Sequence, residues 1–138
     1  MFSGGNDPAN RESLWDAMDS QSDMYKFVAT INNARQAAQG WAYDYVERYV
    51  LDDFFAYSFG DMLVLTTNSD RYIELTLPYL PYEPGTEVCN AFDTSDCATV
   101  ESEGLAISFK SLPKIYLPKD SAYFTESNKD TELKIETA

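Results

Sequence analysis

Between Ser20 and Gly40 the apolar positions recur at spacings of three and four residues, which is typical of a helix with one apolar face. That face carries Met24, Phe27, Val28, Ile31, Ala34 and Ala38. Ser20 and Asp23 resemble a capping box at the start of the segment, and Gly40 suits its end. The pattern therefore predicts one long helix whose apolar stripe must pack against another element.

After Gly40 the period changes to two. The runs rich in Tyr, Phe, Val, Ile and Thr are YDYVERYV, FFAYSF, MLVLTT, RYIELTL, TEVC, CATV, LAISF and KIYL. Phe59-Gly60-Asp61 predicts a hairpin connection, Asn68-Ser69-Asp70 predicts a second, and Pro81, Pro84 and Gly85 interrupt the chain before Thr86. About eight short strands over this length favour an antiparallel β-sandwich with Greek-key connections.

The order of these elements bears on domain organisation. One helix cannot cover both faces of a sandwich, so a helix followed only by strands favours the end of one domain joined to the whole of another. The predicted units are residues 1–40 with the helix, residues 41–118 with the β-sandwich, and residues 119–138 as a polar acidic tail with room for one strand around Leu133 and Ile135.

Composition limits the partners. The chain of 138 residues has 44% apolar and 14% aromatic residues, which is enough for a packed core. Its net charge of -13 would repel nucleic acids and anionic membranes, so neither is expected as a partner, and a neutral ligand is favoured. Neither a transmembrane run nor a signal peptide is recognisable in the chain.

Histidine is absent from the chain, which excludes Ser-His-Asp and Cys-His catalytic sites. The densest group of turn formers is GGNDPANRE, residues 4–12. Asp7 suits a helix N-cap and Pro8 the first position of a short helix that runs to about Trp15, which places Asp7 and Arg11 one turn apart. These two charged residues are either a cap with a solvated arginine or a binding pair.

Three segments carry a family resemblance: FSGGNDPANRESLW, MYKFVATINNAR and LPKIYLP. They resemble the C-terminal part of the α-amylases of glycoside hydrolase family 13, and the likeness extends from residue 2 to about residue 118. The resemblance implies that the opening loop follows the eighth strand of a (β/α)8 barrel, that the helix is the last helix of this barrel, and that the β-sandwich is domain C. It thereby accounts for the unusual order of elements.

The resemblance also implies a role for the opening loop. Asp7 and Arg11 match the loop residues that hydrogen-bond glucose units on the non-reducing side of the cleaved bond. A carboxylate accepts from sugar hydroxyls and a guanidinium donates to them, which suits a neutral polyol ligand. We expect Trp15 to be a core residue rather than a stacking platform.

Retaining glycoside hydrolysis needs two carboxylates about 5–5.5 Å apart. In the family these residues, and a third stabilising aspartate, precede the opening loop, so the resemblance implies that this chain holds no catalytic residue. We expect Asp52, Asp53 and Asp61 to be solvated turn carboxylates. The calcium site of the parent enzyme would also lie upstream, which leaves no metal ligand and no cofactor in this chain.

Cys89 and Cys97 are separated by the seven residues NAFDTSD, a spacing that does not support a metal or redox motif. Because secreted amylases often carry a disulfide in domain C, the resemblance favours a bond over two free thiols.

The expected parent is thus a secreted, extracellular, monomeric α-amylase that cleaves internal α-1,4 bonds of starch with retention. Its partners are starch or maltooligosaccharides and, for this chain, the missing barrel portion of the same protein; the chain alone should be inactive. Two alternatives stay open: another family-13 enzyme of the cyclodextrin glucanotransferase type, and a free-standing β-sandwich that binds carbohydrate or protein without catalysis.

Overall fold

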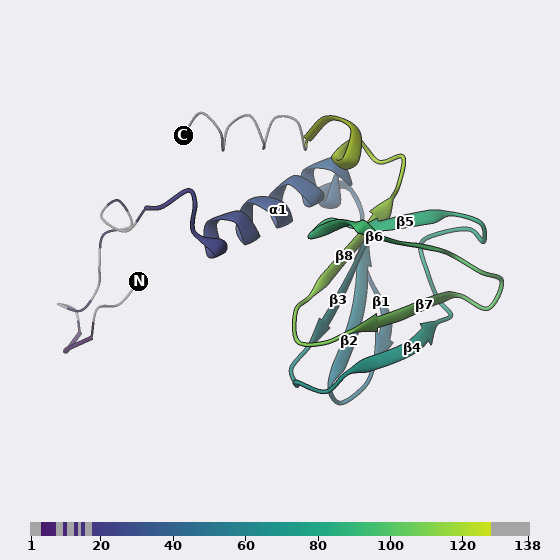
Figure 1. Ribbon diagram of the computed structural model, residues 1–138, viewed down its shortest axis with the longest axis horizontal. Helices are drawn as coiled ribbons and strands as arrows, with labels where there is room; N and C mark the ends of the chain where they lie inside the picture. Colours follow the sequence, from purple (N-terminus) through teal and green to yellow (C-terminus); the bar gives the residue numbers. More distant parts are fainter. Residues whose placement is uncertain (1–3, 8–9, 11–12, 14, 16–17, 128–138) are drawn as a thin grey trace.

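The computed structural model describes residues 4–7, 10, 13, 15 and 18–127. A single α-helix, α1 (Asp23–Ala37), precedes all the strands in this part of the chain (Figure 1). The short helix η1 (Gly40–Ala42) leads to eight strands, and a last helical turn, η2 (Tyr123–Ser127), follows them. The strands are β1 (Tyr45–Val50), β2 (Phe54–Phe59), β3 (Met62–Thr67), β4 (Ile73–Leu77), β5 (Glu87–Asn90), β6 (Asp93–Thr99), β7 (Leu105–Phe109) and β8 (Lys114–Pro118). The predicted fold, mainly β with one long helix before an antiparallel sandwich, is confirmed.

Two sheets form the sandwich, and every pairing within them is antiparallel. Six strands are ordered β1-β2-β3-β8-β5-β6, and β4 pairs with β7 in a second sheet. The predicted hairpin at Gly60 is present between β2 and β3, and Gly60 has a φ of 58°, in the left-handed region that glycine adopts without strain. The hairpin predicted at Asn68-Ser69-Asp70 is wrong, because this segment crosses from β3 to β4 in the other sheet.

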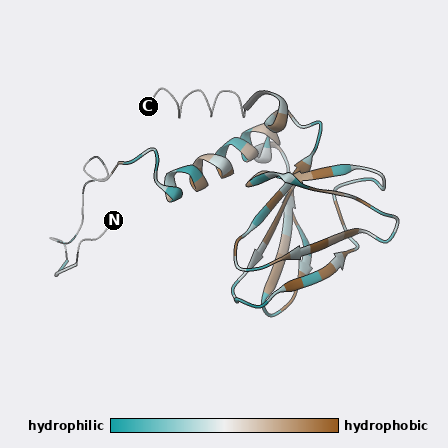
Figure 2. Ribbon diagram, in the orientation of Figure 1, coloured by the Kyte–Doolittle hydropathy of each residue, from teal (hydrophilic) through white to brown (hydrophobic). Residues whose placement is uncertain are grey.

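The main core lies between the two sheets. Alternation in β4 places Ile73 and Leu77 inward, fully buried, with the exposed Glu74 and Thr76 outward, as the colours of Figure 2 show along this strand. On the other side of the core the six-stranded sheet contributes the buried residues Phe54, Ala56, Leu63, Leu65, Val88 and Tyr116. A two-stranded sheet therefore covers the inner face of the larger one.

A second core lies on the outer face of the six-stranded sheet, where α1 packs. Ala34 and Ala38 are buried there with Met62, Val64 and Ile115. Consequently β3 is buried on both faces: Leu63 and Leu65 point into the main core, and Met62 and Val64 point toward the helix. The molecule thus has three layers, with the helix as a partial third.

Only part of the apolar stripe of α1 makes this contact. Ala34 is completely buried, and Phe27 and Ile31 are half-buried, but Met24 is 68% and Val28 46% exposed. Phe27 and Ile31 line the side of the helix that faces the sandwich, and Met24 and Val28 lie on its exposed side.

The ends of α1 differ from the predicted ones. Ser22, rather than Ser20, is the N-cap, and its hydroxyl accepts a hydrogen bond from the Tyr25 amide at 3.2 Å. At the other end Gln39, rather than Gly40, has the left-handed backbone, with a φ of 51°. The helix stops earlier than predicted because Gly40 begins η1, which turns the chain into β1.

Part of the predicted tail packs against the second core. Tyr123 in η2 is 5% exposed, and its hydroxyl donates to the Ala91 carbonyl at 2.9 Å. Sequence reasoning missed this contact because two adjacent aromatic residues, Tyr123 and Phe124, in a polar segment carry no periodic signal. Residues 128–138, with the strand considered around Leu133 and Ile135, lie outside the described part.

Candidate functional site

The opening loop places Asp7 on the surface. Gly4 and Gly5 have φ values of 86° and 92°, which require glycine or a strained residue. The Asn10 amide donates to the Asn6 carbonyl at 3.2 Å and its side chain to the Gly5 carbonyl at 3.5 Å, so this end of the loop folds back on itself. Arg11 and most of the short helix predicted up to Trp15 lie outside the described residues, and the pairing of Asp7 with Arg11 stays a prediction.

Trp15 is 82% exposed, so the prediction of a core position for it is wrong. Neither core extends to this part of the chain, which lies before the first turn of α1 and away from both sheets (Figure 1). An exposed indole offers a flat apolar face to a sugar ring or to another protein surface.

The three acids considered as possible catalytic groups all lie in turns, as predicted. Both nitrogens of the Arg71 fork contact the Asp53 carboxylate, Nε at 2.6 Å and Nη2 at 2.9 Å, and this hydrogen bonding lowers the pKa of Asp53. Burial raises the pKa of Asp61, whose carbonyl accepts from the Tyr82 hydroxyl at 2.8 Å. The Asp53 carboxylate is therefore held by an ion pair, whereas Asp52 and Asp61 are exposed to solvent.

The described residues include no group of three His, Cys, Asp or Glu side chains that could hold a metal ion. In the same part of the chain, no helix has the length and apolar character needed to cross a membrane.

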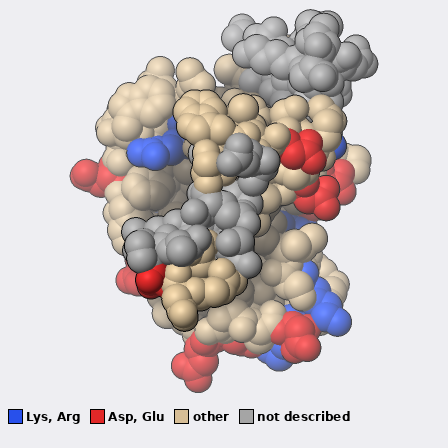
Figure 3. Space-filling model, turned by 90° about the vertical axis from the view of Figure 1, so that its left-hand side faces the viewer, with Lys and Arg blue, Asp and Glu red and all other residues tan. Residues whose placement is uncertain are grey.

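A groove of about 400 Å³ lies between α1 and the outer face of the six-stranded sheet. Its walls include Phe27 and Ile31 from the helix and Tyr57, Phe59 and Met62 from β2 and β3. Figure 3 views the molecule from the side of its N-terminal segment, and uncharged side chains make up most of the face seen there. Sequence reasoning did not identify this groove.

A signal for the groove does exist in the sequence. The run FFAYSF places Phe54, Ala56 and Ser58 in the main core, so Phe55, Tyr57 and Phe59 must line the opposite face. These outer rings lie 5.3 to 6.1 Å from their neighbours, and Tyr45 of β1 adds a fourth ring. Large aromatic residues on both faces of one strand indicate that other parts of the protein cover both faces of the sheet at this strand.

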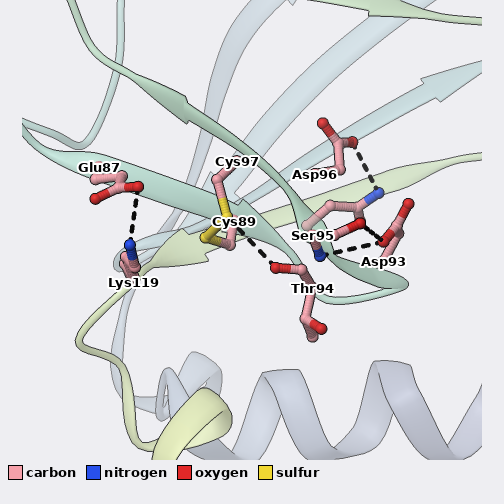
Figure 4. The surroundings of a disulfide bond; sticks show 9 residues. Glu87, Cys89, Asp93, Thr94, Ser95, Asp96, Cys97 and Lys119 are labelled. Atoms are coloured by element: carbon pink, nitrogen blue, oxygen red, sulfur yellow. Dashed lines mark hydrogen bonds and ion pairs between the residues drawn. A yellow bond between two sulfur atoms is a disulfide. The ribbon is translucent and has the colours of Figure 1, made fainter.

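The expected disulfide is present. Cys89 in β5 and Cys97 in β6 are directly opposite one another in the antiparallel register, with Cα atoms 4.1 Å apart and sulfurs 2.04 Å apart (Figure 4). The bond closes the hairpin that contains the residues between them.

Comparison with known proteins gives one curated relative and several solved structures. No family model matches the chain. A curated α-amylase from Saccharomycopsis fibuligera is 31% identical over 127 residues, which cover 85% of this chain and 25% of that protein. The chain thus spans about a quarter of the length of the curated relative it matches.

The solved structures show the same fold. An α-amylase from Malbranchea cinnamomea superposes with a TM-score of 0.75 at 23% identity, over 85% of this chain and 27% of that one. An Anoxybacillus α-amylase gives 0.63 at 20% identity, over 83% and 26%. A γ-cyclodextrin glucanotransferase from alkalophilic Bacillus clarkii gives 0.57 at 21% identity, over 86% and 19%.

Proposed function

We propose that the chain is the C-terminal portion of an α-amylase, as the motifs of the opening loop and the helix predict. Most of the chain is similar to about a quarter of a known α-amylase. The parent hydrolyses internal α-1,4-glucosidic bonds of starch with retention. Within it, residues 1–40 end the catalytic barrel, and residues 41–118 form domain C. The sequence match over 127 residues carries this proposal.

In this proposal the opening loop binds substrate. Asp7 accepts hydrogen bonds from glucose hydroxyls and Arg11 donates to them, and each charge-assisted bond contributes about 1.5–3 kcal/mol. The exposure of Asp7 is compatible with this role. A neutral glucan also suits a chain with a net charge of -13, because it experiences no net repulsion.

The exposed apolar side chains support a larger parent. Trp15, Met24 and Val28 leave large apolar surfaces in water, and the groove beside α1 is lined mostly by apolar residues. Such surfaces mark contacts with other protein segments, here the remainder of the barrel. The catalytic carboxylates and the calcium ligands belong to that remainder, so the chain alone is inactive. The disulfide fits an extracellular protein.

A chimera tests the proposal. The quarter of the Saccharomycopsis fibuligera α-amylase that this chain matches is replaced by residues 1–138, and the release of reducing sugar from soluble starch is measured. We expect an active chimera, and no activity from the 138-residue chain or from the truncated relative. A chimera that folds with the circular dichroism of the relative but lacks activity would contradict the proposal, and so would hydrolysis by the purified chain alone.

The outer aromatic face favours a second candidate, a non-catalytic carbohydrate-binding module. Tyr45, Phe55, Tyr57 and Phe59 form a continuous row of rings, and aromatic faces stack on sugars. Electrophoresis of the isolated chain through gels with and without soluble starch separates the candidates. Retardation that Tyr57→Ala abolishes would favour the module over the enzyme portion.

The cyclodextrin glucanotransferase alternative rests on the Bacillus clarkii structure, to which the fold is also similar. The products that the parent protein forms from starch distinguish the two kinds of enzyme. Linear maltooligosaccharides from starch indicate an α-amylase, and cyclic ones indicate a glucanotransferase.

A further inference from the structure

The turn between β5 and β6 is a junction between the sandwich and both flanking helices. The Phe92 ring in this turn stacks on the Phe27 ring of α1, with centroids 5.1 Å apart and planes inclined by 10°. Ala91 is buried in the same core as Ala34 of α1, and its carbonyl accepts from the Tyr123 hydroxyl of η2. This turn thus supplies part of the surface on which both helices pack, beside the β3 and β8 residues of the same core.

One side of the turn is firmly held. Asn90 belongs to β5, which pairs with β8, and its side-chain oxygen accepts from the Phe92 and Ile115 amides at 3.1 and 3.4 Å. The Ala91 amide donates to the Ile115 carbonyl at 2.8 Å. These bonds attach the first half of the turn to β8.

The other side of the turn is held by much less. Strand β6 is the edge strand of its sheet and pairs only with β5. Its sequence, DTSDCAT, contains no large apolar side chain and has poor strand propensity. Apart from the β5 ladder, its side-chain attachments include a hydrogen bond from the Asn90 amide to the Asp96 carboxylate at 3.3 Å, the ion pair between Asp96 and Lys114 at 2.7 Å, and the disulfide from Cys97 to Cys89.

We propose that the Cys89–Cys97 disulfide is a redox-sensitive clasp that keeps Phe92 and Ala91 in place against α1. While the bond is closed, β6 cannot leave β5, and the turn presents a fixed surface to the helix. When a dithiol reductant supplies two electrons and two protons, the S–S bond breaks, two thiols form, and the dithiol becomes a cyclic disulfide. Strand β6 then separates easily from the sheet edge, Phe92 loses its position, and α1 loosens.

The β2–β3 hairpin and the β4–β7 sheet do not include the two bonded strands, although Val88, next to Cys89, is buried in the core that they share. Because β5 is also paired with β8, reduction should release β6 and loosen α1 more than it affects these two elements. This inference does not depend on starch binding or on the α-amylase assignment.

Hydrogen exchange of the full 138-residue chain, measured by mass spectrometry with and without dithiothreitol, tests the clasp. Closing a loop of this size shifts a local equilibrium by about 10- to 100-fold, so we expect exchange in α1 to accelerate by about this factor on reduction. Exchange in β2 and β3 should stay unchanged. Thiol titration confirms that both cysteines are reduced in the sample compared.

Two variants complete the experiment. Phe92→Ala keeps the disulfide but removes the ring, so its helix should exchange rapidly even when the protein is oxidised. The double variant Cys89→Ala, Cys97→Ala should behave like the reduced protein and show no response to dithiothreitol. Unchanged exchange of α1 in the fully reduced protein would overturn the proposal, and so would an equal acceleration in β2 and β3, which would indicate global destabilisation.

Discussion

The ring of Phe27 in α1 lies nearly parallel to the ring of Phe92 in the β5–β6 turn, with centroids 5.1 Å apart. Two segments far apart in the sequence are joined by this stack, and the joined helix covers part of the outer face of the six-stranded sheet. One face of the helix therefore packs on the sandwich itself, independently of any contact with the remainder of a parent protein.

This packing predicts different effects for two neighbouring residues of α1. Phe27→Ala should lower the free energy of unfolding by about 1–2 kcal/mol, because it removes a half-buried ring and its stacking partner. Val28→Ala should change it by less than about 0.5 kcal/mol, because Val28 is 46% exposed and alanine favours the helix. Urea unfolding followed by circular dichroism measures both. Equal losses would contradict the assignment of Phe27 to the packed side.

Two glycines with positive φ allow the cost of a steric clash to be measured separately from the cost of backbone strain. Gly85 and Gly104 have φ values of 94° and 129°, but a Cβ on Gly104 would lie 2.0 Å from the Leu77 carbonyl oxygen, whereas one on Gly85 would meet nothing within 4 Å. We expect Gly85→Ala to cost about 1–2 kcal/mol from strain alone and Gly104→Ala to cost at least about 3 kcal/mol. Thermal unfolding of the two variants decides the matter. A Gly104→Ala variant no less stable than Gly85→Ala would show that β4 can move away from this position.

The ion pair of Asp53 with Arg71 predicts a pH dependence of stability. Hydrogen bonding from Arg71 holds the pKa of Asp53 below its ordinary value of 3.8. A group with a lowered pKa in the folded state stabilises the protein above the unfolded pKa, and this contribution is lost as the pH falls through the folded pKa.

The difference in urea midpoint between the wild-type protein and Asp53→Asn should therefore be largest near pH 7 and should shrink below about pH 4. Asp52→Asn is the matched control, since it removes a neighbouring charge without breaking the pair. A difference that stays constant down to pH 2 would show that Asp53 does not contribute through its charge.

The strands were predictable from sequence because their alternation is local. Each expected run contains a strand, and Gly60 marks a tight hairpin because its φ is positive. The partners of the strands were less predictable, as Asn68-Ser69-Asp70 shows: its turn residues suit a hairpin, but whether β4 pairs with β3 or crosses to β7 depends on how the whole core closes.

The contacts on the outer face of the six-stranded sheet were the least predictable feature. The stripe of α1 predicts that the helix packs on another element, but its contact with Phe92 in the β5–β6 turn depends on the order of the strands in the six-stranded sheet. Likewise nothing in the residues around Trp15 indicates whether another surface covers it. The candidate loop was found through a specific motif, GGNDPANRE, and the environment of Asp7 could only come from the structure.

The opening loop carries the remaining prediction, measured in the chimera with the Saccharomycopsis fibuligera α-amylase. Arg11→Ala should weaken the binding of longer maltooligosaccharides by about 2 kcal/mol, roughly thirtyfold, because one charge-assisted hydrogen bond to a glucose hydroxyl is lost. Asp7→Ala should have an effect of similar size. Lys26→Ala, which removes an exposed positive charge on α1, should leave affinity unchanged and controls for the overall charge. Isothermal titration with oligosaccharides of increasing length gives the affinities, and the loss should appear only for ligands long enough to reach the loop. If Arg11→Ala and Lys26→Ala bind every length equally well, Asp7 is a cap and Arg11 a solvated side chain.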